Sequence, residues 1–198
     1  VEVTSGQLGV DSGTAVVSGG SVTTPGNFQK TGAGELDMQS SMTVNGTANI
    51  DAGLLSVNGL LQSDGLVVGS NGVLGGSGRI MSNIAVYGKL APGNSPGTLS
   101  VAGNLALGNA SITEIEIASL SSFDRFIVTG QLTLAGTLNI VSYQGFAFEY
   151  GQQFAVAQAG SIVGEFSTIN APATFRGRIL NSGTVATLLM APDTYTRV

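Results

Sequence analysis

The sequence predicts an all-β protein that winds as a solenoid, and three observations point to this class. A five-residue pattern, Val-x-Gly-x-Leu, recurs along the chain. Glycine is abundant, at 30 of 198 residues, while charged residues make up only 10%. Apolar and polar residues alternate, and no window of about 11–18 residues carries the apolar stripe of an amphipathic helix. Repetition of one short unit is typical of chains that stack coil upon coil.

The recurring pattern is interpreted as a short strand, a glycine corner and a second short strand. Its copies begin at Val57, Val86, Val101 and Val128, with a weaker copy at Val44. If a strand with its corner takes about seven residues, three of them complete a turn of about 21 residues, which lies within the range known for solenoid repeats. The chain is therefore expected to form three strands in each turn.

Alternation supports the strands. Ile115 and Ile117 alternate with Glu114 and Glu116, which predicts a half-exposed strand with both glutamates on one face. A second alternating set shares one parity: Leu132, Leu134, Leu138 and Ile140.

Three Asn-Gly pairs mark corners: those at 45–46 and 58–59 lie within copies of the pattern, and the third is at 71–72. Their glycines are expected to supply the positive φ that sharp turns require.

Composition narrows the function classes. The net charge is −5, and the seven lysines and arginines are spread over the whole chain. Binding to a nucleic-acid backbone needs clustered positive charge, so no nucleic-acid partner is expected.

No apolar run reaches the roughly 18 residues that span a bilayer, and no signal peptide is recognisable. Because strand-like alternation begins at the first residues, the chain is interpreted as a piece of a longer protein.

The chain divides into two parts by composition. Residues 1–110 hold 22 of the 30 glycines and two aromatic residues, whereas residues 111–198 hold ten aromatics. Uniform coils need small and aliphatic side chains, and an open end of the stack must be covered. Large rings bury the most area per residue and suit such a cover. We therefore predict β-helix coils over 1–110 and a C-terminal, β-sandwich-like cap over 111–198. Its aromatics are Phe123, Phe126, Tyr143, Phe146, Phe148, Tyr150, Phe154, Phe166, Phe175 and Tyr195.

The segment at 90–99 has the sequence Leu-Ala-Pro-Gly-Asn-Ser-Pro-Gly-Thr-Leu. It resembles a stretch in the passenger domains of Gram-negative autotransporters of the type V, AIDA/pertactin-like class. The runs that follow are similar too: Glu-Ile-Glu-Ile at 114–117, Asp-Arg-Phe-Ile-Val-Thr-Gly at 124–130 and Leu-Ala-Gly-Thr-Leu at 134–138. The resemblance covers about residues 84–198; before that the chain matches only a generic β-helix.

The resemblance implies a right-handed, single-stranded parallel β-helix. It implies a non-catalytic segment of a secreted or surface-displayed virulence factor, exported across the outer membrane. The C-terminal part would act as an autochaperone that folds first, and the partner would be the protein's own C-terminal membrane β-barrel. The cap residues that this expectation singles out are Asp124, Phe126, Val128, Gly130, Tyr143, Phe148, Phe154 and Phe166. The turn motif comprises Pro92, Gly93, Asn94, Pro96 and Gly97.

The segments that resemble catalytic or ligand-binding motifs lack features that those motifs require. Gly93-Asn94-Ser95-Pro96-Gly97 matches the letters of a nucleophile elbow, but Pro96 lacks the N–H that the oxyanion hole needs and the chain has no histidine. A turn is the better interpretation. Gly75–Gly78 fits neither a dinucleotide loop nor a calcium repeat, and is expected to be a corner. The carboxylates are scattered, so a polysaccharide-acting enzyme is the weakest alternative. We expect no enzymatic activity, cofactor or metal.

A second function class stays open at this point. Coil faces rich in Ser, Thr and Asn, with little charge, could pair two rods or bind a host surface molecule, which would make the segment an adhesive or self-associating surface. The glutamates at 114 and 116 are expected to form a solvated face, and Asp124 is expected to hold a turn.

Overall fold

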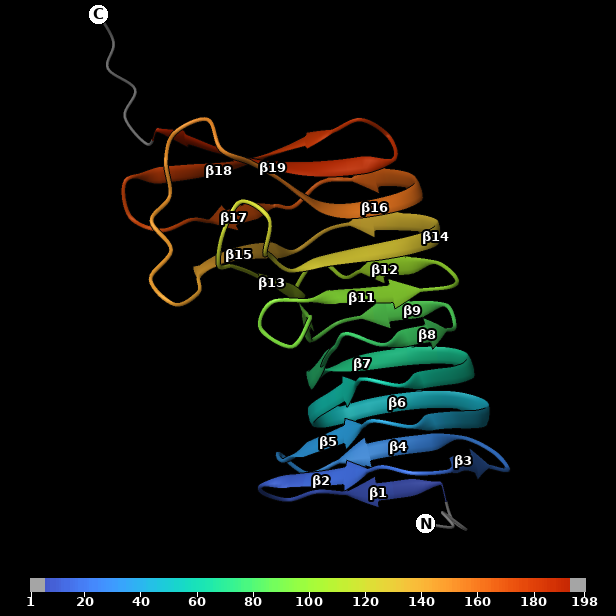
Figure 1. Cartoon of the computed structure of the whole chain (residues 1–198). Helices are drawn as coiled ribbons and strands as arrows, with labels where there is room; N and C mark the ends of the chain where they lie inside the picture. The colour runs from blue at the N-terminus through green and yellow to red at the C-terminus, as the bar shows by residue number, and fades with distance from the viewer. Residues whose placement is uncertain (1–5, 193–198) are drawn as a thin grey trace, which may run out of the picture.

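The computed structural model describes residues 6–192, and the predicted Tyr195 lies outside this range. The described part is all-β, with strands and no helix, and therefore has no helix that could cross a membrane. Stacked parallel strands form a β-solenoid of about six turns, which confirms the predicted class (Figure 1). Each turn has three faces, as the spacing of the repeats predicts.

Face 1 holds β1 (Gln7–Gly9), β4 (Phe28–Thr31), β9 (Ile84–Val86) and β12 (Leu105–Leu107). Face 2 holds β2 (Thr14–Val17), β5 (Glu35–Met38), β10 (Lys89–Pro92), β13 (Ile112–Ile117), β15 (Thr137–Ser142) and β17 (Thr168–Asn170). Face 3 holds β3 (Ser21–Thr24), β8 (Arg79–Met81) and β11 (Thr98–Val101). The long strands bend through corners and serve two or three faces: β6 (Ser41–Val57), β7 (Leu60–Gly76), β14 (Arg125–Leu134) and β16 (Gln153–Gly164).

The core consists of columns in which each side chain lies on its equivalent in the next turn. On face 2, Leu36 pairs with Leu55, and Leu55 pairs with Leu74. Leu74 pairs in turn with Leu90. All four are at most 1% exposed. Because each of these turns covers the previous one with a leucine, this column buries apolar surface without large rings.

The Val-x-Gly-x-Leu pattern marks corners between faces. In the copy at 57–61, Val57 ends the face 2 part of β6 and Leu61 lies on face 3, and both are 0% exposed. In the copy at 86–90, Val86 and Leu90 are likewise buried, on faces 1 and 2. Gly75–Gly78 also lies at a corner, where β7 ends and β8 follows.

The predicted role of the Asn-Gly glycines is wrong. Gly46, Gly59 and Gly72 are not among the glycines with positive φ. What they lack room for is a Cβ: at Gly59 it would overlap the carbonyl oxygen of Ser40, and at Gly72 that of Ile50, both in the preceding turn. At these three corners glycine is required because adjacent turns approach closely, not because the backbone is left-handed.

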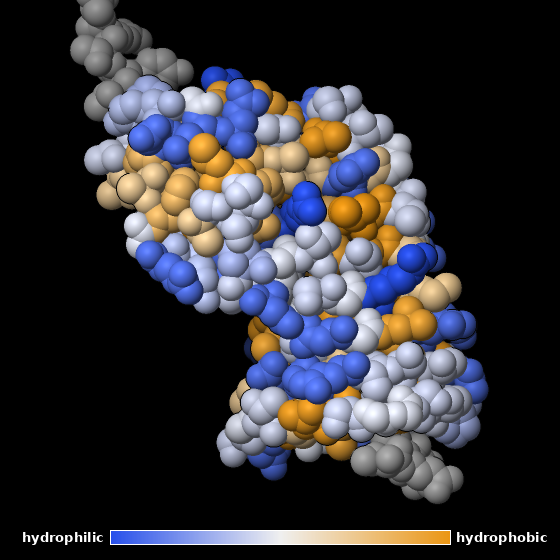
Figure 2. All heavy atoms as spheres, viewed as in Figure 1, coloured by the Kyte–Doolittle hydropathy of each residue, from blue (hydrophilic) through white to orange (hydrophobic). Residues whose placement is uncertain are grey.

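Turn length changes along the stack. Leu36 pairs with Leu55 of the next turn, so the number of residues between them is close to the turn of about 21 residues that the repeats predict. Thr98 pairs with Arg125 and Thr137 pairs with Thr168, and both of these turns are clearly longer. The ladders cross residue 110 without a break, so parallel stacking continues well into the segment 111–198. The additional residues form loops that widen the C-terminal half (Figures 1 and 2).

The C-terminal end of the stack changes direction. β19 (Val185–Pro192) pairs antiparallel with β16, and β18 (Phe175–Asn181) pairs antiparallel with β19. The β19 side chains Ala186, Leu188 and Met190 are at most 1% exposed and belong to the core. The last parallel strand is therefore followed by an antiparallel pair rather than by an open edge.

Candidate functional site: the loop corner and the groove beside it

The long connections all leave the solenoid at the corner between faces 2 and 3, which we call the loop corner. It comprises residues 93–97 between β10 and β11, residues 118–124 between β13 and β14, and residues 143–152 between β15 and β16. They project on one side of the molecule (Figure 1). The segment that resembles an enzyme motif, 93–97, is thus a turn, as expected.

Asp124 joins the turn motif of the loop corner to strand β13. Its Oδ1 accepts a hydrogen bond from the Gly97 N–H at 2.8 Å, and its Oδ2 accepts one from the Glu116 N–H at 2.9 Å. The side chain is only 3% exposed. A Cβ on Gly93 would overlap Oδ1, so the turn motif closes directly over the carboxylate. Asp124 therefore fixes the turn motif to β13, and we call this pair of hydrogen bonds the Asp124 clip.

The electrostatic setting of Asp124 is unusual. Burial raises the pKa of its carboxyl group to about 6, the hydrogen bonds from Glu116 and Gly97 oppose the rise, and the neighbouring Glu116 and Glu114 carboxylates add to it. The group therefore titrates between mildly acidic and neutral pH.

Phe154 is the centre of an aromatic cluster beyond this clip. It is 0% exposed and meets the rings of Phe123, Phe146 and Phe148 edge-on, with centroid distances of 5.4, 6.3 and 6.2 Å. Phe175 of β18 contacts Phe148 at 5.9 Å. Edge-to-face pairs of this kind add stabilisation beyond burial. The cluster thus joins two corner loops to the antiparallel pair.

The remaining predicted residues are distributed more widely. Phe126 and Val128 are buried in face 3 columns of β14, at 1% and 2% exposure. Gly130 is a corner at which a Cβ would overlap the Asn104 side chain. Tyr143 and Phe166 are half-buried and lie outside the ring cluster. Asn94 donates a hydrogen bond to Asn58 at 2.8 Å, which ties the turn motif to the corner of an earlier turn.

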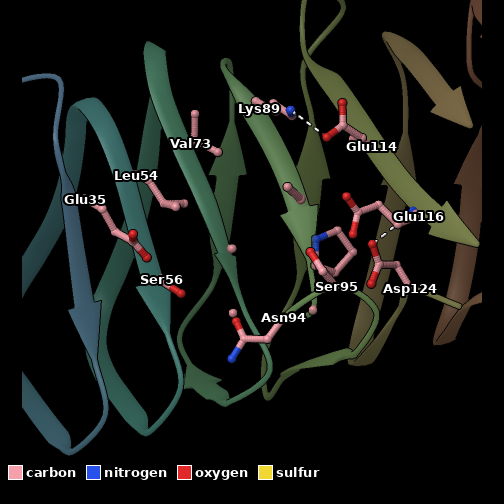
Figure 3. A pocket seen from close by; sticks show the side chains of 15 residues that line it. Glu35, Leu54, Ser56, Val73, Lys89, Asn94, Ser95, Glu114, Glu116 and Asp124 are labelled. Carbon is pink, nitrogen blue, oxygen red and sulfur yellow. Dashed lines mark hydrogen bonds and ion pairs between the residues drawn. The ribbon is translucent and has the colours of Figure 1, made fainter. Parts of the chain in front are cut away.

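A groove lies on face 2, beside the turn motif (Figure 3). It has a volume of about 300 Å³. Its floor is made of small residues of successive turns, Ser56, Gly75 and Ala91. The lining also includes Gly76, Pro92 and Gly93. Its remaining residues are Glu35, Leu54, Val73, Lys89, Asn94, Ser95, Glu114, Glu116 and Asp124. We call this feature the face 2 groove.

Carboxylates outnumber ammonium groups in the face 2 groove. Lys89 Nζ lies 2.8 Å from Glu114 Oε1, and both side chains are about one-third exposed or less. Within the described residues, the Glu116 carboxylate has no hydrogen-bond or ion-pair partner of its own. Glu114 and Glu116 do lie on one strand face, as expected, but they border a groove instead of a flat solvated surface.

Lys30 is a buried residue that sequence reasoning missed. It is 0% exposed and stands on face 1, directly under Ile50. Its Nζ donates hydrogen bonds to the carbonyl oxygens of Thr31, Gly32 and Ala52 at 2.8–3.0 Å. Burial lowers its pKa, which the Asp11 carboxylate partly offsets. Its spacing of two from the buried Phe28 is the signal that could have found it.

Across residues 6–192, no group of three or more His, Cys, Asp or Glu side chains is placed to hold a metal ion. Comparison with known proteins finds neither a matching family model nor a matching curated protein. The fold and the loop corner are thus the basis for any functional proposal.

Proposed function

We propose that this chain is a non-catalytic segment of an autotransporter passenger. In this proposal it is a right-handed β-helical stalk that is secreted or displayed on the surface of a Gram-negative bacterium. The proposal rests on one observation: a stack of parallel turns whose C-terminal end is followed by the antiparallel pair β18–β19 and an aromatic cluster. The residues that resemble the family's motif, 90–99 and 124–130, meet at the Asp124 clip.

The physical mechanism is directional folding. A turn in the middle of a solenoid needs a neighbour on each side, so an isolated turn is unstable. The C-terminal turns have additional support from the Phe154 cluster and from two antiparallel strands. They therefore act as the cap and nucleus on which earlier turns are added, one at a time. Folding outside the cell would then draw the rest of the passenger across the outer membrane.

The proposal assigns the protein's own membrane barrel as its partner and the stalk as carrier of an adhesin or virulence factor. Self-association and binding to a host surface molecule are extensions of this role.

Surface display tests the proposal. The chain is expressed between an amino-terminal epitope and an autotransporter membrane barrel in a Gram-negative host, and exposure is measured with external protease. We expect display of the wild-type chain and its loss in Phe154→Ala, with Tyr87→Ala as a control because Tyr87 is 56% exposed and outside the cluster. Display of Phe154→Ala equal to that of wild type would contradict the nucleus, and periplasmic retention of every form would contradict the passenger role.

A further inference from the structure

We propose that the face 2 groove binds a linear polyamine or the equivalent ammonium groups of an extended lysine-containing peptide, with Glu116 and Glu35 receiving the ammonium groups. This inference does not depend on the proposed function.

The shape of the groove suits an unbranched chain. Ser56, Gly75 and Ala91 form a floor that runs from turn to turn along the stack. Leu54 and Val73, which pair with each other, form an apolar side wall. A methylene chain can lie against this wall, and a volume of about 300 Å³ leaves little room for large branched groups.

The charge of the groove is complementary to a cation. Four carboxylates line it, on Glu35, Glu114, Glu116 and Asp124, against a single ammonium on Lys89. Lys89 already shows how an alkyl-ammonium sits there, because its Nζ lies 2.8 Å from Glu114 Oε1. Both Asp124 oxygens are occupied by backbone N–H groups. Glu116 is therefore the carboxylate most available to a ligand.

The spacing of the carboxylates favours a cation at each end. Glu35 pairs with Leu54, Leu54 with Val73, Val73 with Lys89, and Lys89 with Ile112 of the strand that carries Glu116. Four strand spacings of about 4.8 Å separate the strands of Glu35 and Glu116 by about 19 Å. Glu116 lies four residues further along its strand than Ile112, about 13 Å at about 3.3 Å per residue, so the two positions are about 23 Å apart. The Glu35 carboxylate accepts a hydrogen bond from Thr14 through one oxygen only, so it keeps capacity for an ammonium donor.

Spermine is the first probe, titrated into the whole chain by calorimetry at low ionic strength. We expect saturable binding that weakens at least fivefold in Glu116→Gln and in Glu35→Gln. Asp64→Asn is the matched control, since it removes an exposed carboxylate outside the groove, and it should change the affinity less than twofold. Equal weakening by Asp64→Asn, or no weakening by Glu116→Gln, would overturn the site in favour of non-specific attraction.

A variant that should bind spermine more tightly distinguishes a loss of the site from damage to the fold, because a damaged fold would not raise the affinity. Lys89→Met removes the internal ammonium and frees Glu114, so spermine should bind at least threefold tighter. Arg79→Met removes an equal charge on β8, outside the groove, and should leave the affinity within twofold. Equal gains in both variants would contradict the proposal.

An acetylated Lys-Gly-Gly-Lys peptide is the second probe. Displacement of spermine by this peptide would support the ammonium site, and the two affinities would show whether polyamine or peptide ammonium groups bind more tightly. Failure of both ligands to bind would reject the site.

Discussion

The Asp124 carboxylate accepts a hydrogen bond from the Gly97 backbone N–H at 2.8 Å, across 27 residues of sequence. This contact joins the turn motif to the next corner loop, and a second hydrogen bond from Glu116 fixes the carboxylate from the opposite side. The two parts of the chain that look most like a motif are therefore one structural unit.

Asp124 should make stability depend on pH. Its pKa in the folded state is raised from 3.8 to about 6, so the folded chain holds this proton more tightly than the unfolded chain does. The free energy of unfolding should therefore fall as pH rises from about 4 to about 6 and stay lower above that, by about 3 kcal/mol at most. Urea unfolding at pH 4.5 and 7.5 measures the change.

Asp124→Asn provides the control for this dependence. The amide cannot titrate, so the fall between the two pH values should shrink, although the variant loses one of the two hydrogen bonds and is less stable overall. The opposite result would be a wild-type chain that becomes more stable from pH 4.5 to 7.5, relative to Asp124→Asn. It would show that the hydrogen bonds lower the pKa of Asp124 by more than burial raises it.

Gly59→Ala should destabilise the chain by about 1–3 kcal/mol, because the new Cβ would overlap the Ser40 carbonyl of the preceding turn. Gly26→Ala is a matched control, since a Cβ there meets nothing within 4 Å and the backbone φ is not positive. Chemical unfolding of both variants gives the comparison. Equal stability of the two would refute close approach as the reason for the corner glycines.

Lys30→Met should lower the free energy of unfolding by about 1–3 kcal/mol. The substitution keeps an apolar stem in the column but removes the donor to three carbonyl oxygens. Lys89→Met, at a partly exposed ion pair, should cost less than about 1 kcal/mol. The expectation fails if Lys30→Met is as stable as wild type in thermal and urea unfolding.

Phe154→Ala should cost about 3–5 kcal/mol, because the ring is fully buried and contacts three other rings. Tyr87→Ala, at an exposed ring outside the cluster, should change stability by less than about 1 kcal/mol. Calorimetric melting of both variants checks this, and a loss below about 1 kcal/mol in Phe154→Ala would show that the cluster is not cooperative with the coils.

The repeats predict the solenoid because Val57 and Leu61 must both be buried while the residues between them turn a corner. The sequence could not predict which residues of successive turns pair, because the number of residues in a turn varies. Leu36 pairs with Leu55 after a short turn, whereas Thr137 pairs with Thr168 after a much longer one. Asp124 was therefore recognisable as a turn residue, but its partner Gly97 was not.

The face 2 groove was beyond sequence reasoning for a related reason. Glu116 and Glu35 are far apart in the sequence, and only the stacking register brings them to the same groove. The small floor residues Gly75 and Ala91 have no local signal either, since their meaning depends on taller neighbours in the same register.

Folding from the C-terminal end is the central claim, and pulse-labelling hydrogen exchange during refolding tests it most directly. Amides of β14–β19 should become protected before those of β2–β5, in the wild-type chain diluted from denaturant. Protection that appears first in β2–β5, or in all strands at once, would contradict the nucleus at the Phe154 cluster and the autochaperone role proposed for it.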